Sequence, residues 1–409
     1  MFLLINIIGL LVFLGVAVIF SRDRKNIQWG SIGILVALNL ILAWFFVYFP
    51  AGTFVVEKAA AGISWVIDAA FSGISFAFKS FTVGKEMDMA VAALMPILLV
   101  VPLFDILMYL GILPKVIRGI GWVLAKITRQ PKFEAFFGIE MMFLGNTEAL
   151  AVSSEQLKRM NEARVLTIAM MSMSSVSGAI VGAYVTMIPG ELVLTAIPLN
   201  IVNAMIVASI LNPVKIEATE DVVYDLRSTS EVRQPFFSFL GDSVLNAGKL
   251  VLIIIAFVIS FVALAELADR LIHLITAGIA SLMHLKGGFG LNQILGVFMY
   301  PFALLLGLPV DEAWPVAQQM AKKIVTNEFV VMGEIDGEVN SYDPHHRAVI
   351  STFLISFANF STIGMIIGTL KGIVNEKTSD FVSKYVPMML LAGILVSLLT
   401  AGFVGLFAW

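Results

Sequence analysis

Eight apolar stretches, each close to the length that a helix needs to cross a lipid bilayer, limit the folds open to this chain. They cover residues 1–20, 30–49, 90–110, 166–188, 192–211, 250–267, 349–370 and 385–407. A crossing helix needs about 20 apolar residues, and inside lipid the backbone polar groups must bond within the segment itself. We therefore expect an all-α polytopic membrane protein with eight transmembrane helices.

The composition agrees with a membrane protein and argues against several other classes. Charged residues make up 13% of the 409 residues and the mean hydropathy is +0.94, whereas soluble domains carry about 25% charged residues. A net charge of −3 and the lack of a dense Lys/Arg run argue against a nucleic-acid partner. With no cysteine and four scattered histidines, no disulfide, thiolate site or metal motif is expected, and no cofactor.

Two interrupted apolar pieces lie between the long stretches. Residues 133–151 contain Gly145, and residues 294–331 contain Gly307, Pro309 and Pro315. Short apolar pieces broken by Gly and Pro at corresponding places in two halves are typical of re-entrant hairpins in an inverted repeat. We expect residues 51–89 to lie in the membrane interface as an amphipathic helix, and residues 212–235 to form a cytoplasmic linker.

Loop charge orients the chain in the membrane. The stretch 1–20 has no basic start or cleavage site, so we expect an uncleaved first crossing. The following Arg22, Arg24 and Lys25 place the first loop in the cytoplasm, by the preference of basic loops for that side. Eight crossings of the cell inner membrane then put both termini on its outer side.

Polar residues inside apolar stretches mark the expected binding site. Gly145-Asn146-Thr147-Glu148 interrupts the first piece and Asn327-Glu328 the second. The crossings that follow carry Ser172, Ser174, Ser175 and Ser177 in one half, and Asn359, Ser361 and Thr362 in the other. An intramembrane carboxylate costs roughly 3 kcal/mol or more and is by default functional. A site near the membrane midplane, between the two halves, follows from the paired pattern.

We considered three classes of protein for buried carboxylates in broken helices: a secondary transporter, a passive channel and an intramembrane enzyme. A secondary transporter needs a titratable or ion-binding group beside its ligand site, whereas a passive channel does not. An intramembrane enzyme has no support in the motifs, because the sequence holds no His-Glu-x-x-His pair and no nucleophile elbow. The pattern favours the transporter, and the serines alone are equally consistent with bonds to their own backbone.

The motifs resemble those of a known family. The blocks Gly145-Asn146-Thr147-Glu148-Ala149, Gly307-Leu308-Pro309, residues 323–330 (KIVTNEFV) and residues 357–362 (FANFST) are similar to the signature blocks of concentrative nucleoside transporters. The resemblance implies a homotrimer whose protomers have eight crossings and two re-entrant hairpins. It also implies a scaffold, built from crossings one, two, three and six, that supports an elevator-like transport part.

This resemblance divides the chain and assigns its site. The implied units are residues 1–111 (scaffold helices and the interfacial segment), 112–212 (first transport repeat), 213–268 (linker and sixth crossing) and 269–409 (second transport repeat). The base would be read by Asn146, Thr147 and Glu148 and packed by Phe357 and Ile180. The ribose hydroxyls would be bound by Glu328, Asn359 and Thr362.

Departures from the family pattern bear on the coupling ion. Sodium-driven members are similar in placing Asn where this chain has Met141, beside carbonyls near Leu144, Ser175 and Val176; a thioether is a poor ligand for sodium. Burial favours the protonated form of a carboxylate. Our hypothesis is proton symport of pyrimidine and possibly purine nucleosides through Glu148 or Glu328, with sodium symport as the alternative. Many members also have Gln where this chain has Asn146.

Overall fold

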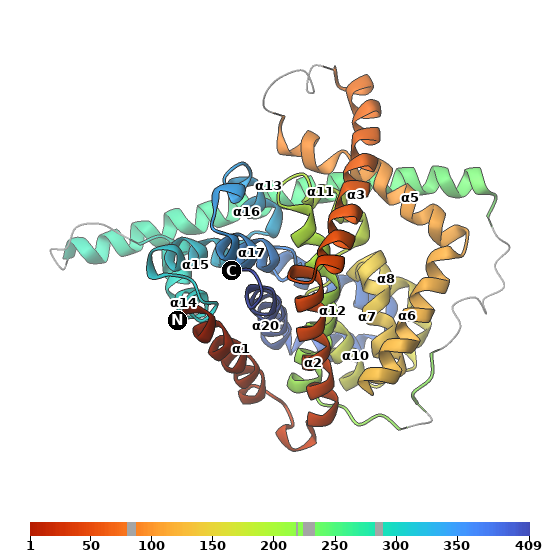
Figure 1. Ribbon diagram of the computed structural model, residues 1–409, viewed down its shortest axis with the longest axis horizontal. Helices are drawn as coiled ribbons and strands as arrows, with labels where there is room; N and C mark the ends of the chain where they lie inside the picture. Colours follow the sequence, from red (N-terminus) through yellow and green to blue (C-terminus); the bar gives the residue numbers. More distant parts are fainter. Residues whose placement is uncertain (80–86, 218–219, 224–233, 283–288) are drawn as a thin grey trace.

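The computed structural model describes residues 1–79, 87–217, 220–223, 234–282 and 289–409. In these ranges every regular element is helical (Figure 1). The first half comprises α1 (Phe2–Ile19), α2 (Trp29–Val47), α3 (Pro50–Ala77), a π-helical turn (Ala90–Leu94), α5 (Ile97–Tyr109), α6 (Ile112–Thr128), α7 (Lys132–Leu144), α8 (Asn146–Val152), α9 (Ser154–Lys158), α10 (Glu162–Ser172), α11 (Gly178–Tyr184) and α12 (Gly190–Leu211). The second half comprises α13 (Phe236–Leu282), α14 (Leu291–Leu305), α15 (Val310–Val325), α16 (Glu328–Ile335), α17 (Pro344–Leu354), α18 (Phe360–Ile373), α19 (Glu376–Ser383) and α20 (Val386–Gly405).

Two of the eight expected crossings are interrupted helices. The stretch 166–188 divides into α10 and α11, and the stretch 349–370 divides into α17 and α18. Both breaks fall on the polar clusters, where the sequence predicts unwinding. Among the described residues, seven helices are long and apolar enough to cross a membrane by length and composition, and these two broken stretches are not among them.

α3 is one of those seven helices, although the sequence places it in the interface. Its 28 residues carry Glu57, Lys58 and Asp68 among apolar side chains. Length and composition allow such a helix to cross the membrane or to lie along it, so the interfacial position stays a prediction. The last part of the expected segment, residues 80–86, lies outside the described residues, as do 218–219 and 224–233 of the expected linker.

α13 is much longer than the crossing expected at residues 250–267. It runs unbroken over 47 residues, about 70 Å at 1.5 Å per residue, and extends across the full width of the molecule in Figure 1. The expected crossing lies within a candidate membrane span of this longer helix, because flanking charges such as Asp242, Lys249 and Arg270 end an apolar run without ending a helix. The unit boundary expected between residues 268 and 269 falls inside this helix.

The centre of the molecule is built around α12 and α20. Of their most apolar 18-residue windows, 83% and 78% are buried, against 6% for α13. Asn39 of α2 donates to Asn203 of α12 at 2.6 Å, and Asn203 donates to Thr400 of α20 at 3.0 Å. Buried polar groups need such partners, so this chain of bonds ties α2 to the two central helices.

Pro315 does not interrupt the second apolar piece as the sequence suggested. It lies inside α15, which continues past it although proline has no N–H for the bond to the carbonyl four residues earlier. The actual break before α15 is at Gly307, whose φ of +84° is open to glycine at little cost.

Candidate functional site

The first break in the helices is formed at Gly145. α7 ends at Leu144 and α8 begins at Asn146, and between them Gly145 has φ +84° and ψ −179°, a conformation that is essentially restricted to glycine. A Cβ atom here would lie 2.9 Å from Cβ of Ser177. The tip of the α7–α8 pair therefore packs directly on the unwound segment between α10 and α11.

The second break is made by a capping asparagine rather than by glycine. α15 ends at Val325 and α16 begins at Glu328, and the Asn327 side chain accepts a bond from the N–H of Val330 at 3.1 Å. The unwound segment between α17 and α18 ends at Asn359, whose side chain accepts from the N–H of Thr362 at 2.9 Å. Each asparagine thus satisfies a free N–H at the start of a helix.

These four breaks surround one cavity of about 90 Å³. It is lined by all eight residues that the sequence and the resemblance proposed for substrate: Asn146, Thr147, Glu148, Ile180, Glu328, Phe357, Asn359 and Thr362. Ligand pockets commonly measure about 300–1,000 Å³, so side chains must move apart before a drug-sized molecule can fit. The structure brings the predicted residues together, and their roles toward a ligand stay predictions.

Glu328 lies at the centre of a hydrogen-bond network. The side chain is only 3% exposed. Its carboxylate accepts from the hydroxyl of Tyr184 and from the amide of Asn359, each at 3.0 Å. The oxygen of Asn359 in turn accepts from the hydroxyls of Ser361 and Thr362 at 2.6 and 3.1 Å. The network holds the carboxylate in one place at the wall of the cavity.

The first break presents a different kind of group. Asn146 is 4% exposed; its oxygen accepts from the N–H of Thr147 at 2.7 Å, while its buried amide nitrogen has no partner. An unpaired buried donor costs about 1–3 kcal/mol, so a ligand acceptor placed against it would be favoured. Glu148, one turn into α8, is exposed. The two carboxylates that the sequence treated alike therefore differ in environment.

The coupling-ion candidates lie beside the first tip. Leu144 lines the cavity, and its carbonyl accepts from Ser177 at 3.5 Å. Ser175 is buried and its hydroxyl donates to the carbonyl of Ser172 at 3.3 Å. Val176 and Met141 are buried as well. In the described part of the chain, no three His, Cys, Asp or Glu residues gather as they would around a metal ion.

Sequence reasoning missed several residues of this cavity. Tyr184 does not line the cavity but donates to Glu328, which does; in the sequence it falls within an apolar stretch, where a hydroxyl near the end of a broken helix is the available signal. α13 contributes Leu250, Ile253, Ile254 and Phe257 to one wall. No signal could have identified these four, because apolar side chains that face a cavity and those that face lipid are of the same types.

Comparison with known proteins decides the family. The family description "Na+ dependent nucleoside transporter C-terminus" matches residues 192–405, and the corresponding N-terminal description matches residues 8–81. The chain is 43% identical to the purine nucleoside transport protein NupG of Bacillus subtilis, over 100% of both proteins. The chain belongs to the concentrative nucleoside transporter family. The resemblance seen in its motifs is confirmed.

Other members of this family agree in sequence and in fold. The chain is 25% identical to the nucleoside permease NupC of Helicobacter pylori, over 99% of this chain and 97% of that protein. The solved structure of CNTnw in an inward-facing substrate-bound state matches with a TM-score of 0.88 at 25% identity, over 100% of this chain and 98% of that one. The protein is thus an all-helical, multi-pass membrane transporter for nucleosides, and not an enzyme.

Proposed function

We propose that this concentrative nucleoside transporter imports purine nucleosides by symport with a cation, and that the cation is a proton. One observation carries the proposal: a single cavity combines the free amide donor of Asn146 with the buried acceptor Glu328. A nucleoside is neutral and has a planar base with an amide-like edge and a diol. It needs donors and acceptors in a dry pocket more than counter-charge.

The cavity suggests how the substrate lies. In our proposal the base faces the first tip, where Asn146, Thr147 and Glu148 read its edge, and Phe357 and Ile180 pack on its faces. The ribose faces the break between α15 and α16. There Glu328 accepts a hydrogen bond from one ribose hydroxyl, and Asn359 and Thr362 make the remaining hydrogen bonds to the ribose. Analogues without ribose hydroxyls should be rejected, since they leave buried polar groups unpaired.

Purines are preferred in this proposal because the relative that is 43% identical bears the name of a purine nucleoside transport protein. The motifs alone had pointed first to pyrimidines, with purines as an open possibility. Asn146 is shorter by one methylene than the Gln of many members, which leaves more room beside the base and supports the larger ring system.

The proton is favoured by the residues where a sodium ion would have to sit. Met141 offers only a thioether, which leaves the carbonyls near Leu144, Ser175 and Val176 as the hard ligands. Glu328 or Glu148 would take up the proton. One proton that moves through 100 mV supplies about 2.3 kcal/mol, enough for roughly fiftyfold accumulation of a neutral solute.

Sodium is the second candidate, supported by the family description and by a rat sodium/nucleoside cotransporter that is 22% identical over 98% of this chain and 63% of that protein.

The remaining parts of our proposal follow the family pattern. They are a homotrimer in the cell inner membrane with both termini outside, eight crossings with two re-entrant hairpins, and elevator movement of residues 112–212 and 269–409 against the scaffold.

Uptake into proteoliposomes tests the function and the coupling ion together. Radiolabelled inosine and uridine are offered under an imposed pH gradient and, separately, under an imposed Na⁺ gradient, with Glu328→Gln beside the wild type. We expect inosine to accumulate with the pH gradient alone and the variant to lose this accumulation.

The other outcomes are equally informative. Accumulation that needs Na⁺ would reject the proton and keep the substrate. A preference for uridine would reject the purine assignment, and equilibration without accumulation would indicate a passive channel.

A further inference from the structure

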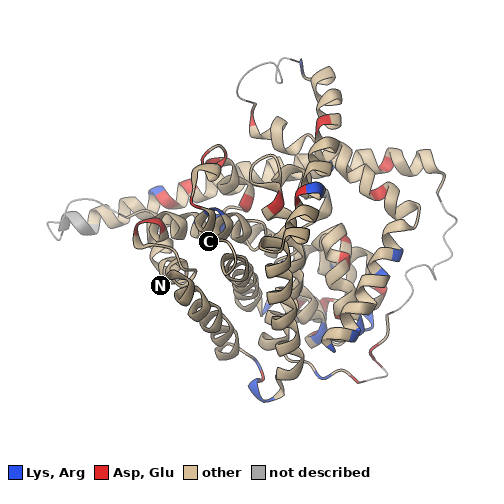
Figure 2. Cartoon of the chain, in the orientation of Figure 1, with Lys and Arg blue, Asp and Glu red and all other residues tan. Residues whose placement is uncertain are grey.

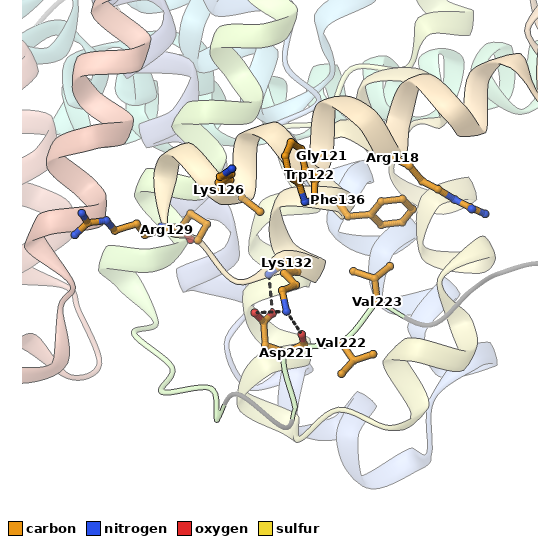
Figure 3. A pocket seen from close by; sticks show the side chains of 12 residues that line it. Arg118, Gly121, Trp122, Lys126, Arg129, Lys132, Phe136, Asp221, Val222 and Val223 are labelled. Carbon is orange, nitrogen blue, oxygen red and sulfur yellow. Dashed lines mark hydrogen bonds and ion pairs between the residues drawn. The ribbon is translucent and has the colours of Figure 1, made fainter.

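A second and larger cavity lies between α6, the start of α7 and residues 221–223 (Figure 3). Its volume is about 780 Å³, within the range of ordinary ligand pockets. The nucleoside cavity shares none of its lining residues. Gly121 and Phe136 form the contact between the two helices, since a Cβ atom at Gly121 would lie 3.1 Å from Cα of Phe136.

The lining of this cavity is basic. Four cationic side chains, from Arg118, Lys126, Arg129 and Lys132, face a single acidic one, from Asp221. Figure 2 shows the same gathering of basic residues along α6 and the start of α7. The cavity is therefore suited to a ligand with negative charge.

Lys132 is engaged with Asp221. Asp221 accepts from the backbone N–H of Lys132 at 2.6 Å, and the ammonium of Lys132 donates to the Asp221 carbonyl at 3.2 Å (Figure 3). This pairing closes the cavity on the side of residues 221–223. The ammonium of Lys126 lies over the ring of Trp122, 4.9 Å from its centre.

The rim of the cavity is apolar. α6 exposes a row of large side chains, and Trp122 and Ile127 are 65% and 53% exposed. Trp122 and Lys126 lie one turn apart on the same face of α6, with the ammonium over the ring. Basic amphipathic helices with exposed apolar side chains lie in the membrane interface, and tryptophan is enriched at headgroup level. α6 thus offers cationic side chains that suit a phosphate and apolar side chains that suit hydrocarbon.

We propose that this cavity binds the headgroup of an anionic phospholipid. The phosphate lies between Lys126 and Arg129, and the acyl chains run along the exposed apolar side of α6. Guanidinium and ammonium groups make strong charge-assisted bonds to phosphate, and clusters of such groups beside the membrane recognise anionic lipids. Because Phe136 of α7 forms part of the cavity, a bound lipid steadies the helix that leads to the Gly145 tip.

Binding is measured on the full-length purified protein in neutral detergent. Phosphatidylglycerol is titrated against phosphatidylcholine of the same chain length, with thermal stability and native mass spectrometry as readouts. The double variant Lys126→Gln/Arg129→Gln removes the phosphate partners. Lys371→Gln/Lys384→Gln removes two exposed cations outside the cavity and serves as the matched control. Trp122→Ser, at an exposed position, tests the apolar rim without disturbing the core.

We expect phosphatidylglycerol to bind the wild type and the control pair alike, and to bind Lys126→Gln/Arg129→Gln about tenfold more weakly. Trp122→Ser should also weaken the lipid. Equal binding of both lipids to the wild type, or undiminished binding to the double variant, would overturn the proposal. If inorganic phosphate or glycerol phosphate displaces the lipid at equal concentration, the site takes soluble phosphate and the lipid assignment is wrong.

Discussion

At the scale of single residues, Tyr184 controls how Glu328 is presented to the cavity. Its hydroxyl donates to the Glu328 carboxylate at 3.0 Å and the ring is fully buried. Tyr184→Phe leaves one carboxylate oxygen without this donor, at a cost of about 1–3 kcal/mol. We expect nucleoside affinity to fall at least about fivefold, measured by isothermal titration. Tyr385→Phe, which removes a hydroxyl outside the cavity, should leave affinity unchanged; equal effects of the two variants would contradict the role of Tyr184.

For Asn146 we expect nucleoside binding to weaken while the stability of the protein hardly changes. Asn146→Leu keeps the volume of the side chain and removes a buried donor that has no partner. The variant also removes the acceptor of the Thr147 N–H, a loss of about 0.5–1.5 kcal/mol that the removal of the unpaired donor offsets, so the free energy of unfolding should change by no more than about 1 kcal/mol. Nucleoside affinity should fall by about 1–3 kcal/mol, and Asn146→Gln should retain binding. A variant that unfolds early but binds normally would make Asn146 a structural residue.

The residues of the site could be predicted to a considerable extent. Amide and carboxylate side chains stand out inside apolar stretches because each is costly in lipid, and those residues do line one cavity. Their partners could not be predicted in the same way. Lys323 is fully buried and donates to Ser356 at 3.0 Å and to Ser397 at 3.3 Å. In the sequence, however, it follows Lys322 near the end of an amphipathic helix, and such a pair of lysines is typical of a surface.

At the scale of elements, the tip at Gly145 is the most sensitive position. Gly145→Ala must adopt a backbone conformation that costs about 1–3 kcal/mol outside glycine, and its Cβ would meet Ser177 at 2.9 Å. We expect a lower melting temperature and a loss of uptake. Gly333→Ala in α16 is the matched control, because nothing lies within 4 Å of the added atom. A Gly145→Ala protein that transports normally would show that the tip is not rigid.

The helix caps separate stability from function. Asn359 caps α18 inside the site, and Asn375 caps α19 outside it through the N–H of Thr378 at 2.9 Å. Removal of either cap by alanine should cost about 0.5–2 kcal/mol of stability. Only Asn359→Ala should also weaken nucleoside binding, since Asn359 additionally donates to Glu328. Denaturation and binding are measured on both; loss of binding in Asn375→Ala would mean that binding simply follows global stability.

Elements were predictable where local chemistry ends a helix. The polar clusters at residues 172–177 and 359–362 mark breaks that the structure has. The extent of α13 was not predictable from hydropathy, because the charged residues at 242, 249 and 270 end the apolar pattern without ending the helix, and Lys and Arg are good helix formers. The same limit applies to α3, for which hydropathy gives a helix but no orientation in the membrane.

At the scale of the whole molecule, hydropathy determined the class of protein and the signature blocks determined the family, but neither could place α13. This helix contributes Phe257 to the nucleoside cavity, which Met365 of α18 also lines. In the proposed elevator, Phe257 belongs to the static scaffold, which includes α13 up to residue 268, and α18 belongs to the moving part. A link between them should therefore stop transport.

The chain has no cysteine, so a double variant can be cross-linked without background. We expect Phe257→Cys/Met365→Cys to lose uptake when treated with a short bifunctional thiol reagent and to regain it after reduction. Phe257→Cys with a monofunctional reagent controls for blockage of the cavity. Lys322→Cys/Glu334→Cys replaces an ion pair within the α15–α16 pair and should transport when linked, because both ends move together. Continued uptake by the linked Phe257–Met365 variant would mean that α13 and α18 move as one body, and the scaffold would then have to exclude α13.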